Sequence, residues 1–142
     1  DFGAIYKGYV ADVNQHVVVG EVPAEAEKIV QGLLDFQHYF EERIKPGVNM
    51  KQLSEEALAW YEETVPGGKA LSIGHSIGLQ CEDQHIFGAF GTLDRPFEEN
   101  MVFEIEAWEE YKGALVGVED CYVVTKDGCR KMTTMPKEIM SV

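Results

Sequence analysis

The stretch from Gly74 to Asp83, GHSIGLQCED, lies at the centre of the chain and separates a helical part from a strand-rich part. His75 stands between small residues, and apolar residues, a cysteine and two acids follow it. A lone histidine in a glycine-rich bend is more often structural than a ligand. Its role therefore depends on the partners that the rest of the 142-residue chain supplies.

Two helices are predicted before this stretch. Apolar residues recur every three or four positions across residues 23–44, which Pro23 opens, and this is the spacing of an amphipathic helix. Asn49 is a good cap for a second helix, and a Pro-Gly-Gly run ends it. Strands at 4–13 and 16–20, rich in β-branched and aromatic residues, precede both helices.

The part that follows is strand-like and rich in turns. The alternating segment MVFEIEAW (101–108) and the returning segment GVEDCYVVT (117–125) predict two strands, with a turn in EEYKG (109–113). Residues 84–100 are predicted to form a loop, and 129–134 a last short strand. Strands, two helices and then further strands indicate an α+β fold rather than a wound parallel sheet.

Composition limits the classes of function. The net charge of −13, from 25 acids against 12 bases, argues against nucleic acid and anionic membranes as partners, because both attract clustered Lys and Arg. The longest apolar runs, such as HVVVG, are far shorter than the roughly 20 residues that span a bilayer. Three cysteines without a C-x-x-C spacing favour reduced thiols in an intracellular protein, and we expect it to be cytoplasmic.

Five polar residues lie in or beside strand-like segments. Asp1 and Asp12 flank the first hairpin-like segment, Glu106 and Glu119 lie on two strands joined by a turn, and His75 lies between the pairs. Carboxylates gathered without Lys or Arg repel one another, so bound cations are the natural compensation. Oxygen ligands with one imidazole suit Mn, Fe, Co or Zn, and bridging carboxylates would hold two such ions.

Periodicity alone does not select these ligands. Glu104 and Glu106 are two residues apart, so a strand places both side chains on the same face. Each acid taken singly is also typical of an exposed strand position. The pattern therefore leaves both a metal centre and a solvated acidic face open.

Four blocks, in order, resemble the motifs of the creatinase, prolidase and aminopeptidase P family. The start DFGAIYKGYVAD resembles its D-x-G-(x)-GY-x-x-D block, and GHSIGL its G-H-x-x-G-L motif. ENMVFEIEAW resembles its G-M-V-x-x-x-E-P-G strand, and GVEDCYVVTKDG its R-x-E-D-x-x-x-V-T-x-x-G close. The resemblance implies the pita-bread α+β fold, incomplete at its N-terminal side, with residues 1–142 as a single catalytic-domain fragment.

The resemblance also implies a complete set of metal ligands. It selects Glu106 over Glu104 and Glu119 over Asp120, and the implied ligands are Asp1, Asp12, His75, Glu106 and Glu119. The Glu–Glu spacing is closer to the prolidase-like branch than to methionine aminopeptidases.

The implied activity is that of a metallopeptidase similar to an Xaa-Pro dipeptidase or aminopeptidase. Two divalent ions (Mn, Co, Fe or Zn) would supply hydroxide to cleave a small peptide or amide bond. Glu106 or Glu82 would shuttle the proton, beside the catalytic ligand His75. A homodimer is compatible with this assignment. We expect the isolated chain to leave an apolar sheet edge uncovered and to fold poorly without a preceding half of the domain.

Several positions depart from the family pattern. Family peptidases commonly carry histidines seven residues after and four residues before the metal histidine, where this chain has Glu82 and Leu71. Ala107 and Trp108 follow the strand glutamate in place of Pro-Gly, and Gly117 replaces the Arg before the last ligand. A non-peptidase enzyme of the same fold, similar to dimethylsulfoniopropionate lyases or amidino-hydrolases, and a non-catalytic binding module are therefore alternatives. The retention of all five ligands favours an enzyme.

Overall fold

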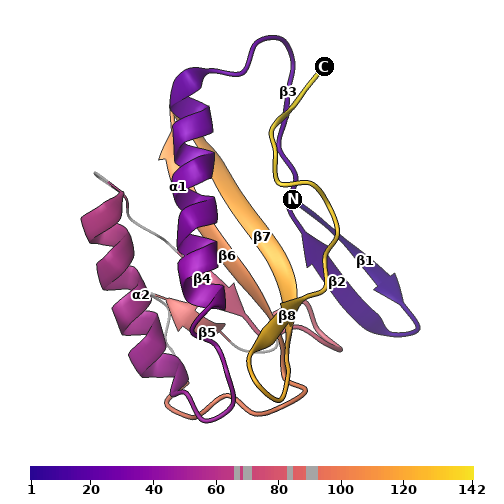
Figure 1. Ribbon diagram of the computed structural model, residues 1–142. Coiled ribbons are helices and arrows are strands. Elements are labelled where there is room, and N and C mark those ends of the chain that lie inside the picture. Colours follow the sequence, from indigo (N-terminus) through magenta and orange to yellow (C-terminus); the bar gives the residue numbers. More distant parts are fainter. Residues whose placement is uncertain (66–67, 69–71, 83–84, 89–92) are drawn as a thin grey trace.

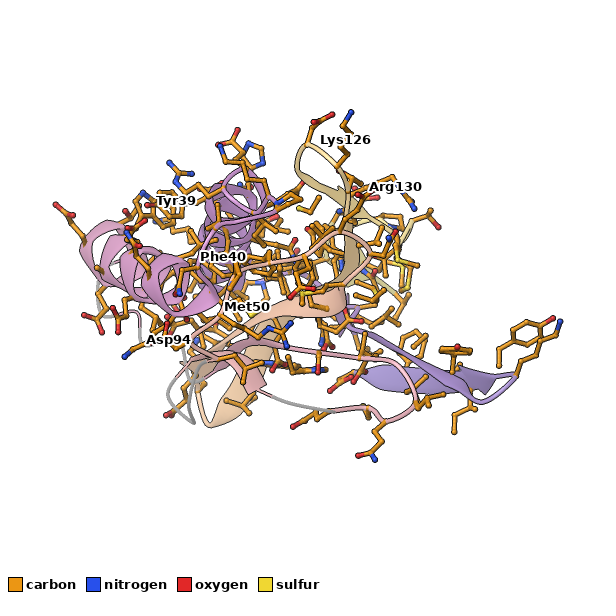
Figure 2. The ribbon with its side chains drawn as sticks, turned by 90° about the horizontal axis from the view of Figure 1, so that it is seen from below. Tyr39, Phe40, Met50, Asp94, Lys126 and Arg130 are labelled. Carbon is orange, nitrogen blue, oxygen red and sulfur yellow. The ribbon has the colours of Figure 1, made fainter. Side chains whose placement is uncertain are left out.

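The computed structural model describes residues 1–65, 68, 72–82, 85–88 and 93–142. Helix α1 lies across long antiparallel strands, α2 lies beside α1, and a β-hairpin projects away from both helices (Figure 1). The view from below also shows this hairpin standing clear of the rest (Figure 2). The elements are β1 (Phe2–Tyr6), β2 (Tyr9–Val13), β3 (Val17–Val18), α1 (Ala24–Glu41), α2 (Met50–Thr64), β4 (Ser72–His75), β5 (His85–Gly88), β6 (Val102–Tyr111), β7 (Ala114–Val124), β8 (Cys129–Lys131) and β9 (Met140–Ser141).

Both long hairpins close with the same two-residue turn. Lys7 and Gly8 join β1 to β2 with φ angles of 52° and 87°, and Lys112 and Gly113 join β6 to β7 with φ angles of 52° and 81°. Positive φ at both central residues is the turn that matches the twist of paired strands. The turn predicted over 109–113 is therefore confined to its last two residues.

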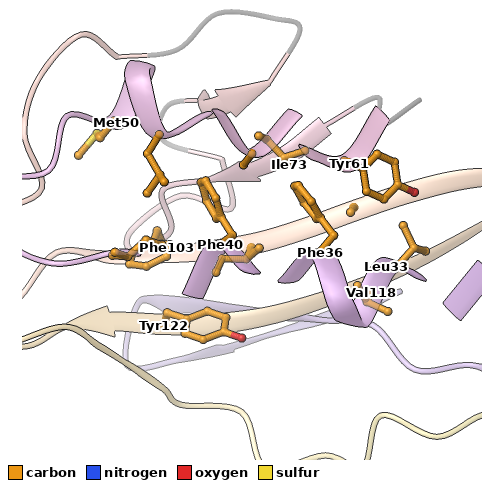
Figure 3. Packing of buried hydrophobic residues seen from close by; sticks show 14 of the residues in the cluster. Leu33, Phe36, Phe40, Met50, Tyr61, Ile73, Phe103, Val118 and Tyr122 are labelled. Carbon is orange, nitrogen blue, oxygen red and sulfur yellow. The ribbon is translucent and has the colours of Figure 1, made fainter. Parts of the chain in front are cut away.

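The two predicted helices are confirmed, and they supply most of the core. Helix α1 begins directly after Pro23, and the side chain of Asn49 caps α2 by accepting a hydrogen bond from the Gln52 N–H at 3.0 Å. Phe36 and Phe40 of α1 are fully buried, together with aromatic rings from α2, β6 and β7 (Figure 3). This packing fixes one face of the β6–β7 ribbon against the helices.

One predicted loop is wrong in part, because residues 85–88 form β5, antiparallel to β4. The register shifts twice along this short pair. Whether such a short segment forms a strand depends more on the strand that pairs with it than on its own residue pattern. The last predicted strand is also shorter than expected, since β8 ends at Lys131.

The β6–β7 ribbon has two unlike faces. Phe103, Ala107, Val118 and Tyr122 are buried in the core on the helix side. Because side chains alternate along a strand, the opposite face carries the other directly paired residues, and three consecutive rows form the middle of that face. These rows are Glu104–Cys121, Glu106–Glu119 and Trp108–Gly117. None of the described helices combines the length and apolarity that a membrane crossing requires.

Candidate metal centre

Three of the five predicted ligands converge from three strands. Asp12 lies near the end of β2, His75 ends β4 and Glu119 lies within β7. One ligand atom of each lies within 4.8 Å of the ligand atoms of the other two. The Val10 N–H donates to the Gly78 carbonyl at 2.8 Å, which ties β2 to the segment after His75. The hairpin is thereby held over the polar face of the ribbon.

The orientation of His75 suits a metal ligand. Its Nδ1 lies 3.2 Å from the Ser76 carbonyl oxygen, and its Nε2 lies 3.5 Å from Oε1 of Glu119. A proton on Nδ1 that is donated to a carbonyl leaves the lone pair of Nε2 directed at the carboxylates. Burial by itself would lower the pKa of His75, but the hydrogen bond to Glu119, the Ser76 contact and the charge of Glu106 raise that pKa to about 9.

Glu119 is the most constrained carboxylate of the cluster. It is 1% exposed, and its Oε2 has no hydrogen-bond partner among the residues that the structure describes. Burial raises the pKa of Glu119, and repulsion from Asp12 and Glu106 raises it further, although His75 acts in the opposite direction. A divalent ion would offset both the desolvation and the repulsion, so these donors fit a metal.

The other two predicted ligands lie together beside this cluster. Asp1 and Glu106 line one hollow of about 320 Å³ with Trp108 and Leu115. Glu106 is paired directly with Glu119 across the ribbon. Strand alternation places Asp1 on the same face of the hairpin as Asp12, because Gly3 pairs with Asp12. The assignment of all five residues as ligands of two ions remains a prediction.

The structure does not bring every predicted functional residue into the cluster. Glu82 is exposed and is not among the described residues that form the Asp12–His75–Glu119 group. Its role as a proton carrier stays a prediction. Leu71, where the family pattern predicts a histidine, lies outside the described residues.

Two side chains that sequence reasoning did not assign to the site hold the ligands in place. The thiol of Cys81 donates to Oδ2 of Asp12 at 2.9 Å, and this hydrogen bond raises the pKa of Cys81 to about 12. The Nε1–H of Trp108 donates to Oε2 of Glu106 at 2.7 Å. The available signal for Trp108 is its position two residues after Glu106, on the same face of a strand.

Two further buried acids flank the site in different ways. Asp120 has lysine partners, with Nζ of Lys137 at 2.9 Å and Nζ of Lys131 at 3.4 Å, and the Thr133 hydroxyl also donates to it. Glu104 is fully buried on the site face, and burial raises its pKa to about 8. Neither Glu104 oxygen makes a hydrogen bond of good geometry to a described residue.

A histidine and carboxylates that converge on the site face of a helix-covered ribbon are donors that suit a metal-binding α+β protein. The chain belongs to metallopeptidase family M24, whose sequence model matches residues 1–126. It is 30% identical over 144 residues to the Xaa-Pro dipeptidase of Pyrococcus furiosus, an alignment that covers 99% of this chain and 40% of that protein. The predicted family is confirmed.

Solved structures agree with this assignment. The X-Pro aminopeptidase from Thermotoga maritima MSB8 is 32% identical with a TM-score of 0.87, covering all of this chain and 40% of that one. Methionine aminopeptidase from Rickettsia prowazekii shares the fold at 20% identity and a TM-score of 0.71, covering 91% and 60%. The pita-bread fold is therefore confirmed. The chain spans about 40% of the length of the Xaa-Pro relatives that it matches.

Proposed function

We propose that this chain carries the metal centre of a peptidase that hydrolyses small peptides of the Xaa-Pro type. The observation that carries the proposal is the convergence of Asp12, His75 and Glu119 within 4.8 Å in a member of metallopeptidase family M24. The names of the relatives, an Xaa-Pro dipeptidase and an X-Pro aminopeptidase, support this substrate class.

Charge favours two ions rather than one. Asp1, Asp12, Glu106 and Glu119 contribute four negative charges, which two divalent cations from among Mn, Co, Fe and Zn would balance. When bound, such ions lower the pKa of a water towards about 7 and polarise the scissile carbonyl. His75 would contribute the lone pair of Nε2, since its Nδ1 faces the Ser76 carbonyl.

Proton transfer is assigned to Glu106. Its carboxylate is half-buried at the edge of the hollow, and the Trp108 indole holds its Oε2. From there it can accept a proton from the attacking water and return it to the leaving amine. Glu82, at the exposed rim, is the alternative carrier.

A non-peptidase reaction on the same fold is the second candidate. It is favoured by Glu82, which is an exposed acid where family peptidases commonly have a histidine. A binding module without catalysis is less compatible with the convergence of Asp12, His75 and Glu119. Homodimer formation and a cytoplasmic location remain predictions from the sequence.

The proposal is tested on the full-length protein by metal analysis and a substrate panel. We expect close to two transition-metal ions per chain and hydrolysis of Xaa-Pro dipeptides. Glu119→Gln should lose both, whereas the control Glu110→Gln, at an exposed position of β6, should keep both. A protein that holds no metal, and gains nothing when Mn or Co is added, would overturn the proposal. Turnover of sulfonium or guanidino substrates alone would favour the second candidate.

A further inference from the structure

Two departures from the family pattern face each other across the β6–β7 ribbon. Trp108 and Gly117 are directly paired. A Cβ atom at residue 117 would lie 2.2 Å from Cε3 and 2.4 Å from Cδ2 of the Trp108 ring. These distances are far below van der Waals contact, so the indole lies against the backbone of Gly117 and requires a glycine there. The two residues therefore form one structural unit.

This packing places the indole N–H on a predicted metal ligand. Nε1 of Trp108 donates to Oε2 of Glu106 at 2.7 Å. The distance is at the short end for an N–H···O bond, as expected when the acceptor is charged. In the next row, Glu106 pairs with Glu119, whose Oε1 lies 3.5 Å from Nε2 of His75. Trp108 therefore forms a hydrogen bond with a predicted ligand of the candidate metal centre.

The donor chemistry of tryptophan makes this contact directional. An indole offers a single N–H and no acceptor, so its ring orientation decides which oxygen it holds. The ring orientation is set by the close contact with Gly117. The Glu106 carboxylate is therefore held by a rigid group rather than by a flexible charged side chain.

We propose that Trp108 is a positioning residue for the metal centre: packed on Gly117, it holds Oε2 of Glu106 through its indole N–H and so orients this carboxylate towards the divalent ions. The inference rests on the proposed function, because it requires Glu106 to be a ligand. Removing a residue that orients a metal ligand typically weakens metal affinity about 10–100-fold.

The test uses Trp108→Phe in the full-length protein, because phenylalanine keeps an aromatic ring but lacks the N–H. Calorimetric titration of the metal-depleted protein with Mn²⁺ should give affinity about 10–100-fold weaker than wild type. The control is Trp60→Phe, which changes the other tryptophan of this chain. Trp60 lies in α2 and stacks on Tyr39 of α1, so this variant should bind Mn²⁺ as tightly as wild type does. If Trp108→Phe also binds as tightly as wild type, the inference is overturned.

Further variants separate positioning from simple packing. Gly117→Ala should weaken Mn²⁺ binding as much as Trp108→Phe does, since the added methyl displaces the indole. In a Glu106→Gln background, Trp108→Phe should cost much less affinity than it does alone, because residues acting through one contact are not additive. Equal costs in both backgrounds would overturn the inference. A wild-type protein that binds no metal would instead overturn the proposed function.

Discussion

Replacing Glu104 by glutamine tests how the site face is stabilised without metal. Glu104 is fully buried one row from Glu106 and Glu119, with Cys121 directly opposite. Burial raises the pKa of Glu104 from its ordinary 4.5 to about 8, and the charges of Glu119 and Asp12 add to this rise. The Cys121 thiol and His75 offset only part of it.

The sign of the pH effect follows from proton binding. Between pH 4.5 and 8 the folded protein holds a proton on Glu104 that the unfolded chain has released. Stability therefore falls as pH rises through this window, by about 1.4 kcal/mol per pH unit and about 5 kcal/mol over all of it. Glutamine is neutral throughout this range. The free energy of unfolding of Glu104→Gln should therefore match that of wild type near pH 5 and exceed it by several kcal/mol above pH 8.

The assay is the thermal midpoint of chelator-treated full-length protein from pH 5 to 9. Glu63→Gln, at an exposed position of α2, is the matched control and should follow wild type at every pH. Excess Mn²⁺ should reduce the difference in thermal midpoint between Glu104→Gln and wild type, because bound cations stabilise the ionised form of Glu104. Parallel curves for wild type and Glu104→Gln would refute the reasoning.

Three further predictions concern the thiol, a cap and the hairpin. Cys81 is exposed, yet in metal-free protein its thiol should react slowly with a thiol reagent at pH 8. Asp12→Asn should accelerate labelling of the peptide that contains Cys81 about 100-fold or more. An unchanged labelling rate would contradict the contact between Cys81 and Asp12. Asn49→Ala should lower the free energy of unfolding in urea by about 1 kcal/mol, because it removes the cap on the Gln52 N–H. The isolated 142-residue chain should melt broadly by circular dichroism, because its β1–β2 hairpin is largely exposed; a sharp monomeric transition would count against this.

Much of the fold was predictable because its signals are local. The apolar spacing of α1 and the cap at Asn49 depend on residues within a few positions of one another. The Lys-Gly turns likewise carry their own conformational preference. Strand β5 was missed because its pairing partner, β4, lies ten or more residues earlier, and no local pattern reports that contact.

Part of the candidate site was likewise predictable from the sequence, and part of it was not. Motif order led to Asp12, His75 and Glu119, and the structure places these three side chains together. The role of Cys81 was not predictable, because it depends on a distance between segments far apart in the chain. For Trp108 the sequence offers only its position two residues after Glu106, because the orientation of its ring depends on Gly117 in the paired strand. Cys81 reaches Asp12 because the loop after His75 is tied to β2, and Trp108 turns towards Glu106 because Gly117 lies opposite.

Two adjacent acids of β7 differ in the partners that balance their charge. Asp120 and Glu119 are both buried, but they point to opposite faces. Asp120 forms ion pairs with Lys131 and Lys137. Among the described residues, Glu119 forms an ion pair with His75, and its Oε2 has no hydrogen-bond partner. Oε2 of Glu119 thus lacks a hydrogen-bond partner among the described residues in a buried site, and this supports the proposal of a divalent ion there.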